Sequence, residues 1–172
     1  MRKFAYTICA MLILQSAPAL ASDYIAKHIS NPAPVGSGRM SVMLWDVYDA
    51  TLYAPEGLLK EDRPLALKLS YLLKLNGKKI ADRSVKEMRD QGFKDEVKLA
   101  TWHTQMRKIF PDVDNGTSIT GVYTKSGETI FYGGDAEIGR INDPEFSKAF
   151  FGIWLNEKTN APALRQQLIG AR

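Results

Sequence analysis

Cysteine is almost absent from this chain of 172 residues, because the single one is Cys9. It lies in an apolar segment that we interpret below as a leader, so the remaining chain holds no thiol. Disulfides, a cysteine nucleophile and a thiolate metal site are therefore excluded from the folded part. A domain without such links is stabilised by burial of apolar surface, and about 150 residues are enough for that.

Signatures of nucleotide binding and hydrolysis are also missing. The sequence has neither a G-x-S-x-G nucleophile elbow nor a G-x-x-x-x-G-K-[ST] phosphate loop. Its two histidines, His28 and His103, have no partner at metal-ligand spacing, so we assign them structural or surface roles. "PDVDNGT" lacks the closing Glu of a calcium loop and predicts a turn. We expect no cofactor and no metal.

The N-terminus has the pattern of a secretory signal peptide. Arg2 and Lys3 precede an apolar run at 4–14, and "APALAS" places Ala19 and Ala21 at the small positions of a cleavage site. The run is too short to span a bilayer. We therefore predict a signal peptide at 1–21 and one domain at 22–172. The protein is then periplasmic or secreted, with no stable membrane anchor after cleavage.

Positive charge is in small excess. The chain has 23 basic and 19 acidic residues, and loss of Arg2 and Lys3 leaves 21 basic residues and a net charge of +2. This excess is too small for the basic footprint of a nucleic-acid-binding domain. We therefore expect no nucleic-acid partner.

The spacing of apolar residues predicts an α+β fold. We expect a short strand at 23–30, a loop at "NPAPVGSG", a long strand or hairpin at 39–53, and a half-buried strand at "PLALKLSYLLK". Two helices follow, in "GKKIADRSVKEMRDQG" and "DEVKLATWHTQMRKIFP". Three short strands, "TSITGVYT", "ETIFYGG" and "AEIGRI", precede two final helices. Strands joined by tight turns pair antiparallel, so helices should cover one face of a curved antiparallel sheet.

The first of the final helices is rich in aromatic residues. Asp143 can cap it and Pro144 suits its first position. One helical face then carries Phe146, Ala149, Phe150, Ile153 and Trp154. This face predicts a helix packed on the core, with one or two aromatic residues lining a cleft.

Arg39 is the first candidate for ligand binding. It precedes a segment that holds Tyr48 and Tyr53, and a guanidinium at the mouth of an aromatic cleft binds carboxylates or phenolates through two N–H groups. A surface arginine on an edge strand is an equally good interpretation. Asp49 either faces water or pairs with a cation, for which Arg39 is the nearest candidate. On the first helix, Arg83 and Glu87 can pair at i, i+4 spacing on a solvated face.

Most of the chain beyond the leader resembles a bacterial member of the chalcone isomerase-like family. The similar segments, in the family's order, are "VYDATLYAPEG", "LALKLSYLLKLNGKKIADRSVKEM", "IFPDVDNGTSITGVY" and "DPEFSKAFFGIWLNEKTNAPALRQQLIG". The resemblance implies an open-faced β-sandwich in which a ligand cleft lies between a large antiparallel sheet and the helices layered on it.

The resemblance also bears on activity. Plant enzymes of the family cyclise chalcones with an Arg, a Thr, and a Tyr and an Asn on a helix. Arg39 resembles that Arg and Tyr48 falls near the Thr, whereas Ile80 and Glu87 replace the Tyr and the Asn. Other members of the family bind fatty acids without catalysis, and the resemblance implies that Arg39 holds the carboxylate.

Three functions stay open on this basis. The first is an exported, non-enzymatic binder of a small hydrophobic or amphipathic carboxylate such as a fatty acid. Its expected ligand-binding residues are Arg39, Tyr48, Tyr53, Trp102 and Trp154. The second is an isomerase or intramolecular lyase on an unknown, chalcone-like substrate, with Arg39 anchoring an oxyanion. The third is a structural or accessory domain without a small ligand.

Overall fold

A single antiparallel sheet organises the protein. A computed structural model describes residues 22–60 and 64–170; the predicted signal peptide at 1–21 and its Cys9 lie outside these residues. Each strand pairs with the next in the chain, giving the order β1-β2-β3-β4-β5-β6. The strands are β1 Pro32–Val42, β2 Trp45–Pro55, β3 Leu65–Tyr71, β4 Ser118–Tyr123, β5 Thr129–Gly133 and β6 Ala136–Ile141.

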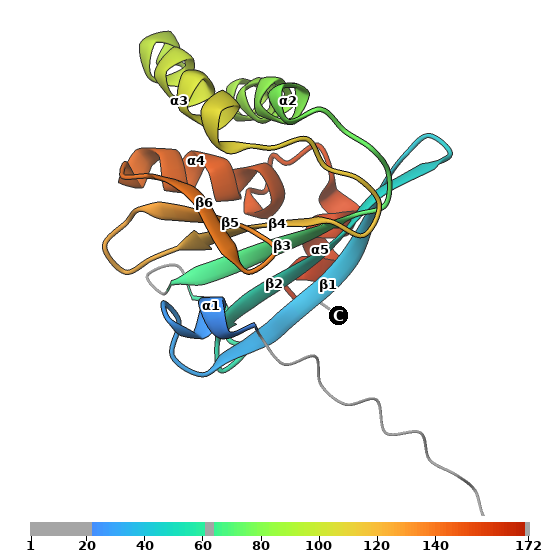
Figure 1. Cartoon of the computed structure of the whole chain (residues 1–172), viewed down its shortest axis with the longest axis vertical. Helices are drawn as coiled ribbons and strands as arrows, with labels where there is room; N and C mark the ends of the chain where they lie inside the picture. The colour runs from blue at the N-terminus through green and yellow to red at the C-terminus, as the bar shows by residue number, and fades with distance from the viewer. Residues whose placement is uncertain (1–21, 61–63, 171–172) are drawn as a thin grey trace, which may run out of the picture.

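Four helices cover one face of the sheet (Figure 1). They are α2 Gly77–Asp90, α3 Glu96–Ile109, α4 Pro144–Leu155 and α5 Pro162–Leu168. α4 lies against the sheet, α2 and α3 form a further layer above α4, and α5 packs on β1. This confirms the predicted curved antiparallel sheet with helices layered on one face. None of the helices in the described part of the chain is long and apolar enough to cross a membrane.

Polar side chains set where the helices begin. Asn76 accepts hydrogen bonds from the backbone N–H groups of Lys78 and Lys79 at the start of α2. Asp143 does the same for α4, whose first residue is Pro144. These caps satisfy N–H groups that have no partner within the helix. The predicted cap at Asp143 is therefore confirmed.

The main core lies between the sheet and the helices. The aromatic face of α4 is buried in it, with Phe146 fully inaccessible and Phe150 and Trp154 nearly so. β3 contributes Leu65, Leu67 and Leu69 to this core, as its period-two pattern predicts. The alternation turns Ala66 of β3 to the opposite face, where it joins a second, smaller apolar cluster.

One prediction about the segment that helps to form this second cluster was wrong. Residues 23–30 were predicted to form a strand, but Asp23–Ala26 form the short helix α1. α1 covers the face of the sheet that the other helices leave open (Figure 1). Its Tyr24 and Ile25 are buried against Tyr53 and Tyr132, and Tyr24 Oη lies 2.9 Å from Thr120 Oγ1. Burial against the sheet decides the conformation of this short segment.

The predicted loop "NPAPVGSG" is a second correction, because its residues from Pro32 onward form the first part of β1. Proline disrupts a central strand, since it has no N–H for the ladder. β1 is an edge strand that pairs only with β2. No strand pairs with the outer side of β1, so a missing backbone N–H on that side costs no hydrogen bond between strands, and Pro32 and Pro34 are tolerated.

Candidate ligand-binding cavity

A cavity of about 330 Å³ lies between α2, the β1–β3 part of the sheet and the end of α4. Its wall is mostly apolar and includes Met40, Leu69, Tyr71, Ile80, Phe150 and Ile153. The polar groups that reach it are Tyr48, Lys79, Arg83, Ser84, Glu87, Thr159 and Asn160. A largely apolar hollow with few polar groups is the usual form of a small-molecule site.

The sheet supplies one wall through cross-strand neighbours. Met40, Tyr48 and Tyr71 stand side by side on β1, β2 and β3 and all line the cavity. β2 has a β-bulge next to Tyr48. Tyr48 pairs with Met40 and Asp46 pairs with Ser41, so Val47 between them has no partner on β1. The bulge lets consecutive residues, Val47 and Tyr48, both line the cavity.

α2 supplies the facing wall. Ile80, Arg83, Ser84 and Glu87 recur at three- and four-residue spacing, so they share one face of the helix. Lys79 lines the cavity from the turn before Arg83. The side chain of Arg83 is 62% exposed, whereas that of Glu87 is 8% exposed. The cavity therefore reaches solvent near the guanidinium and holds the carboxylate inside.

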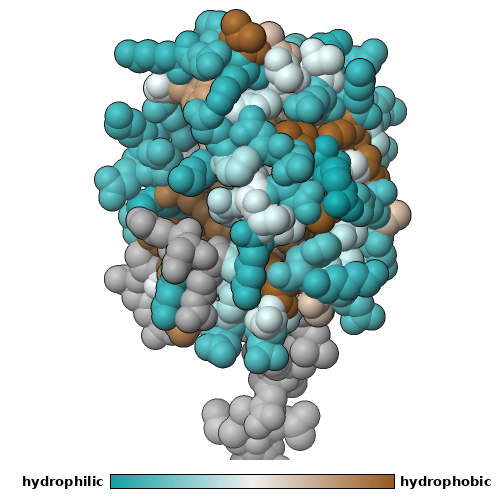
Figure 2. Space-filling view, turned by 90° about the vertical axis from the view of Figure 1, so that its left-hand side faces the viewer, coloured by the Kyte–Doolittle hydropathy of each residue, from teal (hydrophilic) through white to brown (hydrophobic). Residues whose placement is uncertain are grey.

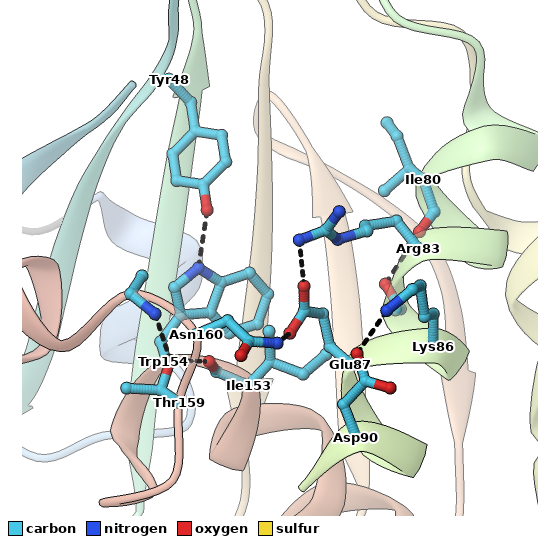
Figure 3. Close-up of polar contacts among 12 residues, drawn as sticks. Tyr48, Ile80, Arg83, Lys86, Glu87, Asp90, Ile153, Trp154, Thr159 and Asn160 are labelled. Carbon is cyan, nitrogen blue, oxygen red and sulfur yellow. Dashed lines mark hydrogen bonds and ion pairs between the residues drawn. The ribbon is translucent and has the colours of Figure 1, made fainter. Parts of the chain in front are cut away.

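The carboxylate of Glu87 has two partners, one charged and one neutral (Figure 3). Arg83 Nη2 pairs with Glu87 Oε1, and Asn160 Nδ2 donates to Glu87 Oε2 at 2.7 Å. A buried carboxylate without such partners would be costly. The predicted Arg83–Glu87 pair is thus confirmed, but the expected solvated face is wrong, because Glu87 lies in the cavity wall.

The loop between α4 and α5 holds Asn160 in place. Thr159 Oγ1 donates to the carbonyl of Ile153 at 2.7 Å and accepts from the backbone N–H of Ala161 at 3.1 Å. These contacts brace the loop on both sides of Asn160 (Figure 3). The amide is therefore fixed by local hydrogen bonds where it meets Glu87.

Tyr48 and Trp154 form the other polar contact of the cavity. The indole Nε1 of Trp154 donates to the hydroxyl oxygen of Tyr48 at 2.9 Å (Figure 3). Burial raises the pKa of Tyr48 and outweighs the opposite effect of the Trp154 hydrogen bond. The phenol therefore stays neutral at physiological pH, and its proton can be donated to a ligand.

Two of the five predicted ligand-binding residues line the cavity, namely Tyr48 and Trp154. Ile80 and Glu87, which the family resemblance placed at functional positions, line it as well. The remaining three, Arg39, Tyr53 and Trp102, do not.

Arg39 is the main correction. Its Nε and Nη2 bind the carboxylate of Asp49 at 2.6 and 2.9 Å, and its Nη1 binds Asp46 at 3.0 Å. Arg39 pairs across strands with Asp49 and precedes cavity-lining Met40, so strand alternation turns it to the other face. The expected arginine at the cavity mouth is therefore not Arg39. The alternative, a surface arginine on an edge strand, is the one observed, and Asp49 pairs with it.

Tyr53 and Trp102 belong to other parts of the interior. Tyr53 is buried in the second apolar cluster beside Tyr24 and Tyr132. Trp102, on α3, is buried against α4, where its ring centroid lies 5.6 Å from that of Phe146 and its Nε1 donates to Asp143 at 3.0 Å. Both residues stabilise the fold at a distance from the cavity wall.

Among the polar residues whose place in the site was not predicted, Arg83 and Asn160 contact Glu87 directly. The i, i+4 spacing to Glu87 indicated the ion pair of Arg83, but not that the pair faces inward. Asn160 belongs to an irregular loop and contacts a residue 73 positions away, so no local pattern could identify it.

Neither histidine is among the residues that line the cavity. His28 and His103 lie elsewhere, against Tyr132 and Asp82 at 2.8 and 2.6 Å. Within the described residues, no group of three His, Cys, Asp or Glu side chains could hold a metal. The carboxylate of Glu87 is engaged by two partners.

Comparison with known proteins identifies the family. The sequence profile described as chalcone isomerase-like matches residues 35–170, most of the chain. The chain belongs to the chalcone isomerase-like family. An uncharacterized protein of Haemophilus influenzae is 26% identical over 153 residues, which cover 88% of this chain and 75% of that protein.

A solved structure has the same fold. It is the crystal structure of a fatty-acid binding protein of Arabidopsis thaliana, with a TM-score of 0.64 and 13% sequence identity. The match covers 81% of this chain and 87% of that chain. The predicted chalcone isomerase-like architecture is thus confirmed.

Proposed function

We propose that the protein is a non-enzymatic binder of a small amphipathic carboxylate, such as a fatty acid. The observation that carries the proposal is the apolar cavity of about 330 Å³ with Arg83 at its solvent end. The acyl chain occupies the apolar part, and the carboxylate meets Arg83 and Lys79. The fold shared with a fatty-acid binding protein of Arabidopsis thaliana supports this class of ligand.

The charges at the cavity favour an anion. Lys79 and Arg83 contribute two positive charges and Glu87 one negative charge, so the net charge of the three is +1. The guanidinium has five N–H donors, and its Nη2 pairs with Glu87. The other donors can bind a carboxylate at the opening. Tyr48 can add a hydrogen bond from the wall.

Substitution of Arg83 tests the proposal. We expect delipidated Arg83→Ala to bind a fatty acid roughly tenfold more weakly than wild type by calorimetric titration, because it loses a charge-assisted hydrogen bond. The methyl ester of the same fatty acid should bind both proteins alike, which separates a lost anion contact from a damaged cavity. Arg89→Ala is the matched control, since Arg89 lies on the same helix and pairs with Glu96 outside the cavity.

Two results would contradict the proposal. One is a wild-type protein that does not bind fatty acids at all after delipidation. The other is turnover of a chalcone, detected by loss of its absorbance, which would establish the isomerase alternative. Ile80 and Glu87 replace the Tyr and the Asn of the plant enzymes, so the phenol and the amide of this cavity, Tyr48 and Asn160, come from other elements.

Export is a separate proposal that rests on the sequence of residues 1–21. We expect the protein purified from its native host to begin at Ser22, and intact-mass measurement would show this. A mature chain that still carries Arg2 and Lys3 would exclude cleavage after Ala21.

A further inference from the structure

The turn between β1 and β2 exposes four consecutive apolar side chains. Val42, Met43, Leu44 and Trp45 are 51, 93, 96 and 71% exposed. The hairpin projects beyond the end of the sheet (Figure 1). Among the described residues, the other large apolar side chains that are exposed are Leu58 and Val97, which are single residues far apart in sequence. Isolated exposed apolar residues are ordinary, but a contiguous run marks an interaction site.

The backbone conformation of the turn is a second indication that its apolar residues have a role beyond folding. Val42 pairs with Trp45, so Met43 and Leu44 form a two-residue turn, and Met43 has a φ of 56°. Hairpins commonly place glycine or asparagine at such a position, because a side chain strains the left-handed conformation. A methionine here weakens the turn and adds a fully exposed apolar side chain. Folding alone does not account for that choice.

The hairpin is also continuous with the cavity. Val42 and Val47, on its two strands, line the cavity together with Lys79 and Arg83. Apolar side chains and two cations thus meet at one opening. Figure 2 shows another side of the molecule for comparison. Hydrophilic side chains cover most of that surface, and the apolar ones are mostly recessed between them.

We propose that the hairpin tip, Val42–Trp45, inserts into the interface of an anionic lipid bilayer and places the cavity opening against the headgroups. Apolar side chains that enter the acyl boundary beside lysine and arginine are the pattern of interfacial membrane binding. Tryptophan favours the same depth. Lys79 and Arg83 complement the negative surface charge. The docking rests on the hairpin tip and on the cations Lys79 and Arg83, and only the view of the cavity as a fatty-acid site rests on the proposed function.

Tryptophan fluorescence gives a direct readout. Trp45 is exposed, whereas Trp102 and Trp154 are 2 and 7% exposed. Vesicles of phosphatidylcholine and phosphatidylglycerol should shift the emission of delipidated wild-type protein to the blue. Trp45→Phe should abolish the shift while the protein still sediments with the vesicles. A shift that persists in Trp45→Phe would overturn the assignment to the hairpin.

Matched substitutions test the contribution of the tip. Met43→Ser combined with Leu44→Ser should weaken vesicle partitioning at least about tenfold, because both side chains leave the acyl boundary. Val97→Ser removes another exposed apolar side chain, on α3, and should change nothing. Lys79→Glu should weaken partitioning onto phosphatidylglycerol vesicles by at least about fivefold, with a smaller effect on pure phosphatidylcholine.

The outcomes separate this inference from the proposed function. The double serine variant should still bind a fatty acid in solution, since neither residue lines the cavity. Equal partitioning of wild type and double variant would overturn membrane docking, whatever the result for fatty acids. Self-association of wild type in ultracentrifugation, abolished by the same two substitutions, would overturn it in favour of an interface between two copies.

Discussion

At the scale of single residues, Glu87 limits how well the cavity holds an anion. Its carboxylate lies in the wall beside Arg83, where it opposes a second carboxylate. We expect Glu87→Gln to tighten fatty-acid binding roughly fivefold, which corresponds to about 1 kcal/mol for two unit charges near 4 Å in a watery setting. The amide oxygen can still accept from Asn160. Titration calorimetry measures the effect, and unchanged or weaker binding would place the ligand carboxylate away from Glu87.

Tyr48 satisfies the indole of Trp154, so its loss should affect stability. Tyr48→Phe leaves the N–H of a nearly buried tryptophan without its acceptor. The free energy of unfolding should fall by about 1–3 kcal/mol, the usual cost of an unsatisfied buried donor. Urea denaturation measures this. In a Trp154→Phe background the same change should cost less, and equal costs in both backgrounds would show that the two residues are not coupled.

At the scale of elements, Asp143 joins α3 to α4. It caps α4 and accepts a hydrogen bond from Trp102 on α3. Burial acts to raise its pKa, but the hydrogen bonds from Trp102 and from the N–H groups of Glu145 and Phe146 together lower it. Asp143→Ala should therefore cost about 1–2 kcal/mol of unfolding free energy at neutral pH.

The pH dependence of that loss has a definite sign. A carboxyl with a lower pKa in the folded state stabilises the fold above its unfolded pKa, near 3.9, and this contribution is lost as the pH falls through the folded pKa. The stability gap between wild type and Asp143→Ala should thus be constant above about pH 5 and narrow below about pH 4. Urea denaturation at several pH values tests this. A gap that widens on acidification would show that the ionised carboxylate does not stabilise α4.

The elements show how far local sequence patterns extend. β3, α2, α3 and α4 were predictable, because period-two and period-3.6 apolar patterns, caps and terminal glycine or proline agree there. β1 and α1 were not. Pro32 and Pro34 resemble a loop unless the segment is known to be an edge strand, and α1 is fixed by burial against distant β4 and β5.

The residues of the site were also only partly predictable from local sequence patterns. Tyr48 was predictable as a residue of an aromatic strand, but its face depends on pairing. Arg39 is adjacent to Met40, which lines the cavity, so the side chain of Arg39 lies on the opposite face of the sheet. Tyr53 is five positions from Tyr48, and because side chains alternate along a strand, it also lies on the opposite face. The bulge at Val47 brings Asp46 and Asp49 to the same side as Arg39, although their spacing of three would otherwise separate them. No sequence pattern indicated the bulge.

At the scale of the whole molecule, the cavity exists because three remote segments meet. β2 supplies Tyr48, α2 supplies Glu87, and the loop after α4 supplies Asn160. The Tyr48–Trp154 contact spans 106 positions. Such contacts arise from the tertiary arrangement of α2 and α4 over the sheet. The family resemblance therefore identified the architecture, whereas the cations of the site, Lys79 and Arg83, became evident only from the structure.

The volume of the cavity predicts the length of its ligand. A water molecule occupies about 30 Å³ and a methylene group is similar in size, so about 330 Å³ holds roughly ten carbon atoms. Each methylene buried adds about 0.8 kcal/mol, so affinity should rise roughly fourfold per carbon. Saturated fatty acids should show this slope up to roughly ten carbons and a plateau beyond, because the apolar part of the cavity is then filled while the carboxylate remains at Arg83. Titration calorimetry across a chain-length series measures both features.

A substitution in the wall can move the plateau. Ile153 lines the cavity and is partly exposed, so Ile153→Ala enlarges the hollow with less loss of core packing than truncation of Phe150. The plateau should shift to longer chains by roughly two or three carbons, since about that many carbon atoms are removed from the side chain. Val97→Ala, outside the cavity, should leave it unchanged. If affinity does not depend on chain length, or if Ile153→Ala leaves the plateau in place, the acyl chain is not held between α2 and the sheet.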